Sequence, residues 1–223
     1  LLLQQGDTLI AATPGQVRLQ HNASIDPSRK LFTVEILAGA VTVASGARAA
    51  ALGADALNRG ALGCAAQALG LAQRMIDLSV KYTSERQQFG KPIGSFQAVK
   101  HHMANIAVRL EYAKAPTHRA AYAIAQGRSG AAHASAGHAS ASHASAGHAS
   151  AGHAVSHAKL VACDAANLAA KNCHQVHGAM GYTWEVDLHI FMKKAWALAN
   201  TWGDAGFHKT RIGDRIFTRG TAL

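Results

Sequence analysis

The sequence has few of the residues that stabilise a disulfide-bonded, zinc-bound or membrane-embedded fold. Only 6% of its 223 residues are aromatic, and it contains four prolines and three cysteines. Cys64, Cys163 and Cys173 are odd in number and form no Cys-x-x-Cys pair, which argues against a disulfide framework and a zinc site and fits a reducing compartment. No apolar run approaches the roughly 18 residues that a membrane helix requires. We therefore expect no membrane span and no metal, and a location in the cytoplasm, or in the mitochondrial matrix of a eukaryote.

Acidic residues are scarce as well. The chain has 22 Lys and Arg residues against 12 Asp and Glu residues, which gives a net charge of +10 with neutral histidines. Such a charge favours an anionic partner without naming it. The basic residues are dispersed and are not interleaved with aromatic side chains, as a nucleic-acid-binding surface requires, so we do not expect nucleic acid as the partner.

Alanine, by contrast, is abundant, and hydrophobic residues make up 49% of the chain. Alanine favours closely packed helices because it loses no side-chain entropy when a helix forms. The composition therefore predicts a mainly α fold.

The first 46 residues have a different pattern from the rest. Short runs of alternating apolar and polar residues, separated by proline and glycine turns, predict strands at 8–11, 17–19 and 31–37. A few short strands without a covering layer leave an apolar face and unpaired edges exposed. The chain also begins with Leu1 instead of Met, so we expect this segment to be the end of a larger sheet domain whose beginning is missing.

Apolar residues at spacings of three and four predict helices in the remainder. The first covers 49–84, and the second begins near Ser95 and is kinked or ended by Pro116, because proline removes an intrahelical hydrogen bond. A third ends at His177, where Gly178 is a natural left-handed C-terminal residue. The third, fourth and last helices are expected at 156–176, at 188–200 and in a short segment after residue 206. Four or five such helices form a bundle.

Residues 127–154 form a low-complexity insert of alanine, serine, glycine and histidine. A five-residue step rotates about 140° around a helix, so the successive imidazoles do not share one face. Nothing in the insert is bulky enough to bury, which favours a flexible loop over a poor helix or a segment that binds metal or protons. The regularly spaced histidines are His133, His138, His143, His148 and His153.

Two motifs in the helical part resemble the acyl-CoA dehydrogenase family. The first is YTSERQQFGKPI at 82–93, followed by Phe96-Gln97 and preceded by ALGLAQ at 68–73. The second is QVHGAMGYT at 175–183, in the same order as in the family. A complete family member has an N-terminal helical domain, a middle β-domain and a C-terminal four-helix bundle. The resemblance implies that residues 1–46 are the end of the middle β-domain.

The resemblance implies that residues 47–223 are the C-terminal helical bundle and that the cofactor is FAD. An arginine at a helix end beside a glycine-containing turn can bind a pyrophosphate bidentately, and Arg86 has this position; the alternative is a surface ion pair with Glu85 or Asp77. By resemblance the flavin is held mainly by another subunit, so its site requires an oligomer. The cofactor-binding residues implied by the resemblance are Arg86, Gln88, Phe89, Phe96, Gln97, Gln175, Gly178 and Ala179. From the residues alone, Phe96, Met103 and Phe191 are also expected in the core, and His177 as a packing or turn-capping imidazole.

The family reaction needs a carboxylate that removes the acyl α-proton while hydride passes to the flavin. The two positions where family members carry this base hold Trp202 and Gly60 here. Asp204 is the nearest substitute and our catalytic candidate, although a carboxylate there also suits a helix N-terminus. Asp55 is a weaker candidate, and a third possibility is that a different chain supplies the base. Many members bind substrate with an Asp and an Arg, and the corresponding positions here hold Asn58 and Ala61.

Two functions follow from the resemblance. The first is an FAD-dependent acyl-CoA dehydrogenase of fatty acid or lipid degradation that converts an acyl-CoA to the 2-enoyl-CoA. The second is an inactive, flavin-supporting subunit of a heteromeric acyl-CoA dehydrogenase. The implied partners are the acyl-CoA substrate, further subunits in a homo- or hetero-oligomer arranged as a dimer of dimers, and an electron-transfer flavoprotein as acceptor.

Overall fold

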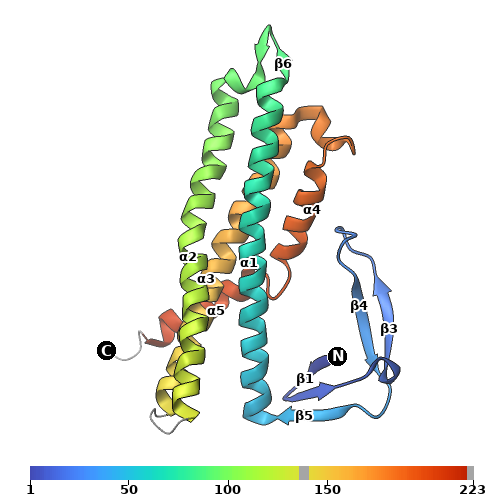
Figure 1. Ribbon diagram of the computed structural model, residues 1–223, viewed down its shortest axis with the longest axis vertical. Helices are drawn as coiled ribbons and strands as arrows, with labels where there is room; N and C mark the ends of the chain where they lie inside the picture. The colour runs from blue at the N-terminus through green and yellow to red at the C-terminus, as the bar shows by residue number, and fades with distance from the viewer. Residues whose placement is uncertain (136–140, 220–223) are drawn as a thin grey trace. The chain divides into compact units, whose positions relative to one another are not determined.

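The computed structural model describes residues 1–135 and 141–219, with side chains described for 1–126 and 151–217 (Figure 1). The chain forms two compact units, which meet in sequence between Arg59 and Gly60. Each unit is described separately below.

The first unit contains five short strands. β1 (Leu2–Gln5), β2 (Thr8–Ala11) and β5 (Val41–Ser45) form an antiparallel sheet in the order β1-β2-β5. β3 (Val17–Asn22) and β4 (Leu31–Ile36) form a separate antiparallel pair. The three strands expected from the sequence are confirmed, with shifts of up to three residues at their ends. β1 and β5 were not predicted; Leu2-Leu3-Gln4-Gln5 lacks the alternation that marks a half-buried strand.

The second unit is helical. α1 (Gly46–Glu85) begins in the first unit and continues into the second, and the hairpin of β6 (Gln87–Gln88) and β7 (Lys91–Pro92) follows it. Figure 1 shows α2 and α3 side by side along their length. The remaining elements are the short turns η1 (Pro14–Gln16) in the first unit, η2 (Ile93–Ser95) and η3 (Gly178–Tyr182), and the helices α2 (Gln97–Ser135), α3 (Ala141–His177), α4 (Leu188–Ala199) and α5 (Ala205–Arg219). The mainly α fold class is thereby confirmed.

One expectation about α2 and α3 is wrong, and one is wrong in one of its two alternatives. Pro116 lies inside α2 and does not end it, so of the two alternatives, a kink or an end, the end is wrong; Ala113 and Ala120 on either side are fully buried, and such packing offsets a lost hydrogen bond. The insert at 127–154 is not a loop over most of its length, since α2 reaches Ser135 and α3 starts at Ala141. Alanine's helix propensity explains this difference. Residues 136–140, with His138, lie outside the described residues.

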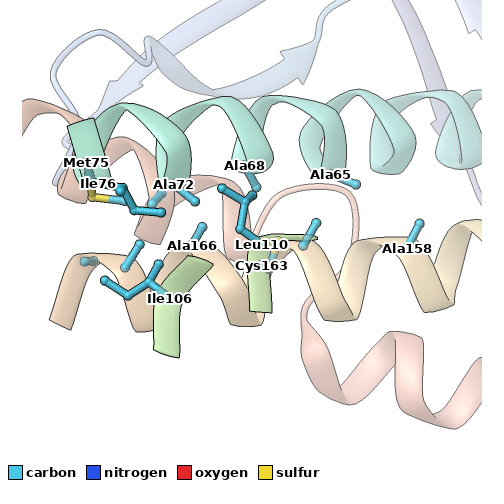
Figure 2. Close-up of a cluster of buried hydrophobic side chains, with 14 of the residues drawn as sticks. Ala65, Ala68, Ala72, Met75, Ile76, Ile106, Leu110, Ala158, Cys163 and Ala166 are labelled. Carbon is cyan, nitrogen blue, oxygen red and sulfur yellow. The ribbon is translucent and has the colours of Figure 1, made fainter. Parts of the chain in front are cut away.

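The core of the second unit is built largely from alanine. Small side chains on α1 and α3, among them Ala65, Ala68 and Ala166, are fully or almost fully buried and belong to one hydrophobic cluster (Figure 2). Larger side chains fill the remaining space; Met75, Ile106 and Leu110 are almost completely buried, and Met103 and Phe191 pack against the cluster. Met103 and Phe191 are therefore confirmed as core residues.

Candidate functional site

The first motif ends α1 and forms the β6–β7 hairpin. The backbone N–H of Arg86 donates to the Tyr82 carbonyl at 2.8 Å, and the Arg86 carbonyl accepts from the Ile93 N–H at 2.8 Å. Phe89 and Gly90 form the two-residue turn, with φ of +56° and +78°. Positive φ at both turn positions is the geometry that twists a tight hairpin correctly, and it normally selects Asn-Gly. Phe89 is thus held in a left-handed conformation that is unfavourable for its residue type.

The hairpin presents polar and aromatic groups outward. The Phe89 side chain is 92% exposed, and its ring meets the half-buried Phe96 ring edge-on at 6.1 Å between centroids. The Lys91 ammonium lies 4.4 Å from the Phe96 ring centre. The side chains of Arg86, Gln88 and Gln97 are exposed as well.

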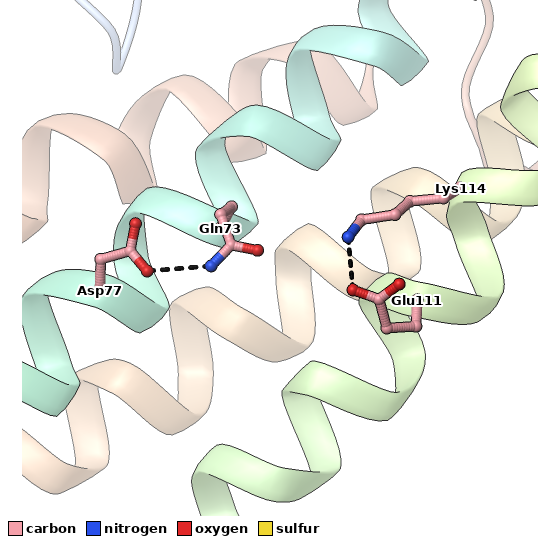
Figure 3. Close-up of polar contacts among 4 residues, drawn as sticks. All are labelled: Gln73, Asp77, Glu111 and Lys114. Atoms are coloured by element: carbon pink, nitrogen blue, oxygen red, sulfur yellow. Dashed lines mark hydrogen bonds and ion pairs between the residues drawn. The ribbon is translucent and has the colours of Figure 1, made fainter.

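The ion pair that was the alternative for Arg86 is not formed. Among the described residues, the ion pairs include none with Arg86, and Asp77 instead accepts a hydrogen bond from the Gln73 amide at 2.9 Å (Figure 3). The same figure shows the ion pair of Glu111 and Lys114 on α2, remote from the hairpin in sequence. The Arg86 guanidinium is therefore available to an anion.

The second motif forms the end of α3 and lies against the first. The His177 ring stacks on the Tyr82 ring at 4.4 Å between centroids, and the Tyr82 hydroxyl donates to the His177 carbonyl at 3.5 Å. Gly178 has φ +57°, which confirms its left-handed position after the helix. Gln175, Gly178 and Ala179 are exposed. Both motifs consequently meet at one end of the bundle and expose their polar groups there.

His177 is a packing residue, as expected. It is 3% exposed, its Nδ1 donates to the Cys173 carbonyl at 2.7 Å, and its Nε2 has no hydrogen-bond partner among the described residues. Burial lowers the pKa of His177, opposed by the backbone hydrogen bond. The imidazole is therefore kept neutral beneath the exposed motif.

The two positions that carry the base in the family lie against each other. A Cβ added at Gly60 would lie 2.2 Å from Cδ2 of the Trp202 indole, so the ring occupies the space in front of α1. Trp202 itself has φ +58°, and Gly203 follows at +93°. A large apolar ring thus occupies the position where the resemblance to the family predicts a carboxylate.

Asp204 caps a helix. Its Oδ1 accepts from the Phe207 N–H at 2.8 Å and its carbonyl accepts from the His208 N–H at 3.2 Å, which satisfies donors in the first turn of α5. The carboxylate is exposed and lines a cavity of about 600 Å³ between α2, α3 and α5. Asp55, the weaker candidate, forms an ion pair with Arg59 at 2.7 Å in the first unit.

A buried polar network behind the α4–α5 loop was not predicted. The Lys159 side chain is 2% exposed, and its ammonium donates to the Leu198 carbonyl at 2.6 Å and to the Ala199 carbonyl at 3.3 Å. His208 is fully buried; its Nε2 donates to the Trp202 carbonyl at 3.1 Å and its Nδ1 accepts from the Ser156 hydroxyl at 3.0 Å. These contacts fix the loop that carries Trp202. No local signal marks Lys159 or His208, because their partners come from other helices.

Comparison with known proteins now places the chain in a family. A family model described as "Acyl-CoA dehydrogenase, C-terminal domain" matches residues 49–217. This match spans most of the chain, so the chain belongs to the acyl-CoA dehydrogenase family. Across the residues that the structure describes, no helix is both long and apolar enough to cross a membrane.

Individual relatives agree with this assignment. Acyl-CoA dehydrogenase FadE34 of Mycobacterium tuberculosis is 34% identical over 137 residues, which is 61% of this chain and 17% of that protein. The ChsE4–ChsE5 complex of M. tuberculosis matches with a TM-score of 0.75 at 22% identity, over 94% of this chain and 51% of that one. A glutaryl-CoA dehydrogenase of M. smegmatis in complex with FADH2 matches with a TM-score of 0.70 at 19% identity, over 98% of this chain and 53% of that one. The chain therefore spans about half or less of these relatives.

Proposed function

We propose that this chain is a flavin-supporting subunit of a heteromeric, FAD-dependent acyl-CoA dehydrogenase. The observation that carries the proposal is the Trp202 indole against Gly60, because neither position where the family holds its base has a carboxylate. Removal of an α-proton needs a base of suitable pKa within hydrogen-bond reach. In this proposal the base belongs to a different chain.

The exposed end of the bundle fits a dinucleotide. Arg86 offers a guanidinium that no ion pair of the described residues neutralises, and a guanidinium binds phosphate oxygens bidentately. Gln97 and Gln175 offer amides that both donate and accept, and Phe89 offers an apolar ring. When bound, FAD supplies the acceptor for the hydride that leaves the acyl β-carbon. We assign Gln88, Phe96, Gly178 and Ala179 to the border of the same site.

This assignment makes the assembly part of the function. The flavin contacted by this chain is proposed to be held mainly by a neighbouring subunit, in a dimer of dimers that passes electrons to an electron-transfer flavoprotein. The ChsE4–ChsE5 complex among the structural neighbours supports a heteromeric arrangement, and the neighbour crystallised with FADH2 supports the cofactor.

A gain-of-function variant tests the proposal. In the full-length protein purified with its companion subunits, Trp202→Glu places a carboxylate at the family position, and we expect an additional flavin to bleach anaerobically when butyryl-CoA or a longer acyl-CoA is added. Trp202→Gln is the matched control, and we expect it to bleach no more flavin than the wild type does. If the wild-type chain assembles without companion subunits and all of its flavin bleaches with acyl-CoA, the proposal is contradicted.

Dehydrogenation with Asp204 as the base is the second candidate. The observation that favours it is the exposed Asp204 carboxylate on the wall of the cavity of about 600 Å³. Asp204→Asn distinguishes the two, because asparagine caps a helix as well as aspartate does but cannot act as a base. A loss of turnover of about 10²-fold or more with an unchanged melting temperature supports Asp204 as the base, and unchanged turnover excludes it.

A further inference from the structure

Three helices surround a second, strongly basic cavity. Its volume is about 390 Å³, and it lies between α2, α3 and α5. Arg119 on α2 is about 33 Å along that helix from Gln97, at 1.5 Å per residue, so the cavity is remote from the proposed flavin-binding end. The lining residues are Pro116, Arg119, His153, Ala154, His157, Arg215 and Ile216.

The charged side chains among the described lining residues of this cavity are all basic. Two guanidinium groups and two imidazoles line it, and none of the described lining residues is acidic. The sequence contains no Asp or Glu between Glu111 and Asp164, although this stretch supplies the lining of α2 and α3. On α5, Asp214 is the sequence neighbour of Arg215 and is the one carboxylate near the lining residues in sequence. The cavity therefore carries a positive potential.

Two buried nitrogen atoms beside the cavity have no hydrogen-bond partner among the described residues. They are Nδ1 of His153 and Nη1 of Arg211. Arg211 lies over Gly152, the neighbour of His153, so closely that a Cβ there would be 2.3 Å from Nη2. Buried donors are normally satisfied, so each orphan needs an explanation. A hydrogen-bond acceptor that enters the cavity would give His153 Nδ1 a partner.

The protonation of His153 responds to the same surroundings. Burial lowers its pKa most, and the cations Arg215 on α5, His157 on α3 and Arg119 on α2 lower it further. A bound anion removes this electrostatic penalty. Anion binding and protonation of His153 are thus expected to favour each other.

A metal ion is the competing ligand, because His153 and His157 have the i, i+4 spacing of a helical metal-binding pair. The guanidinium groups of Arg119 and Arg215 line the same cavity and repel a cation. No cluster of three or more metal-ligating side chains occurs within the part of the chain that the structure describes. The positive charge of the lining therefore favours an anion over a cation.

We propose that the cavity of Arg119, His153, His157 and Arg215 binds a phosphate group, either as inorganic phosphate or as a phosphate monoester. The guanidinium groups match the paired oxygens of a phosphate, and His153 Nδ1–H donates to a third. The volume exceeds that of one phosphate, and Pro116 and Ile216 provide an apolar wall for an organic remainder. This site is independent of the proposed flavin role.

Calorimetric titration of the full-length protein, in its native assembly, with sulfate tests the site without a change in ligand charge, since sulfate stays a dianion across the histidine range. We expect binding to tighten at least about tenfold from about pH 8 to about pH 6, with proton uptake. Inorganic phosphate and glycerol 3-phosphate are then compared at one pH, and tighter binding of the ester identifies an organic ligand. Sulfate affinity that is equal at both pH values overturns the proposal, and so does the absence of sulfate binding; Ni²⁺ binding would then identify a metal site.

Variants locate the binding. Arg119→Gln and His153→Gln are each expected to weaken sulfate binding about tenfold or more. Arg109→Gln is the matched control, because it removes the same charge from the same helix outside the basic cavity, and it is expected to change the affinity less than twofold. Equal weakening by Arg109→Gln and Arg119→Gln would show a general charge effect and overturn the site. Melting temperatures within the error of the wild type confirm that the variants fold.

Discussion

At the scale of single residues, Phe89 and Trp202 have strained backbone conformations. Both are non-glycine residues with positive φ, at +56° and +58°, a conformation that disfavours large side chains. Both carry exposed aromatic rings, so neither conformation is explained by burial in the core. Such strain persists where the surrounding structure imposes it, commonly at sites of function.

Phe89→Asn is expected to stabilise the fold and to weaken flavin retention. Asparagine tolerates the left-handed turn position, and the mostly exposed ring loses only its edge contact with Phe96, so we expect a gain of about 0.5 kcal/mol in the free energy of unfolding. Urea unfolding and the flavin content of the purified assembly measure the two effects. Tyr112→Asn, at an exposed helical position with negative φ, is the control and should not stabilise. Unchanged flavin content would remove Phe89 from the site.

Gly60→Ala is expected to destabilise the second unit by about 1–3 kcal/mol, because the new methyl group overlaps the Trp202 ring. The same substitution in the Trp202→Ala background should cost less than 1 kcal/mol, since the overlap is gone. A double-mutant cycle from urea unfolding gives the coupling between the two positions. Additive effects would mean that the ring does not occupy this space.

At the scale of elements, buried alanines on α1 and α3 form much of the core of the second unit. Ala65 is fully buried, whereas the next residue, Ala66, is exposed on the same helix. The small residues at 65, 68 and 72 are all fully buried in this cluster, where a larger side chain would collide with its neighbours. The two neighbouring alanines therefore form a natural test pair.

Ala65→Leu is expected to lower the free energy of unfolding by about 1–3 kcal/mol through overpacking. Ala66→Leu should change it by less than about 0.5 kcal/mol, because leucine and alanine have similar helix propensity and the site is exposed. Chemical denaturation of both variants gives the comparison. Equal effects at the two positions would contradict the close packing around Ala65.

At the scale of the whole molecule, buried histidines make the fold sensitive to acid. The pKa values of His177 and His208 are lowered mainly by burial, and both rings are neutral donors to backbone carbonyls. Below about pH 6.5 the unfolded chain takes up protons that the folded chain resists. Stability is therefore full above this pH and is lost as the pH falls below it.

His208→Gln is expected to reduce this loss. Each neutral buried histidine contributes up to about 1.4 kcal/mol per pH unit in the window where only the unfolded state is protonated. We expect the slope of unfolding free energy between about pH 6.5 and 5 to fall in His208→Gln and to remain in His101→Gln, which removes an exposed imidazole of α2. An identical slope in both variants would show that His208 does not contribute.

Much of the architecture could be predicted from the sequence. The spacing of apolar residues predicted α4 within one residue and α1 within three, and Gly178 marked the end of α3. The insert was the main error, because low complexity suggested a loop while alanine propensity favours helix. The helix end that was one of two alternatives at Pro116 was wrong for a related reason: the sequence shows the lost hydrogen bond but not the packing that offsets it.

The sequence by itself determined the family, because the two motifs are local runs of residues whose spacing on a helix and turn is set by the backbone. Only the tertiary structure decided which distant residues meet. The indole of Trp202 against Gly60, the Lys159 and His208 contacts to the α4–α5 loop, and the basic cavity each join separate elements. These contacts depend on how helices pack, and side-chain packing has no signal in local periodicity.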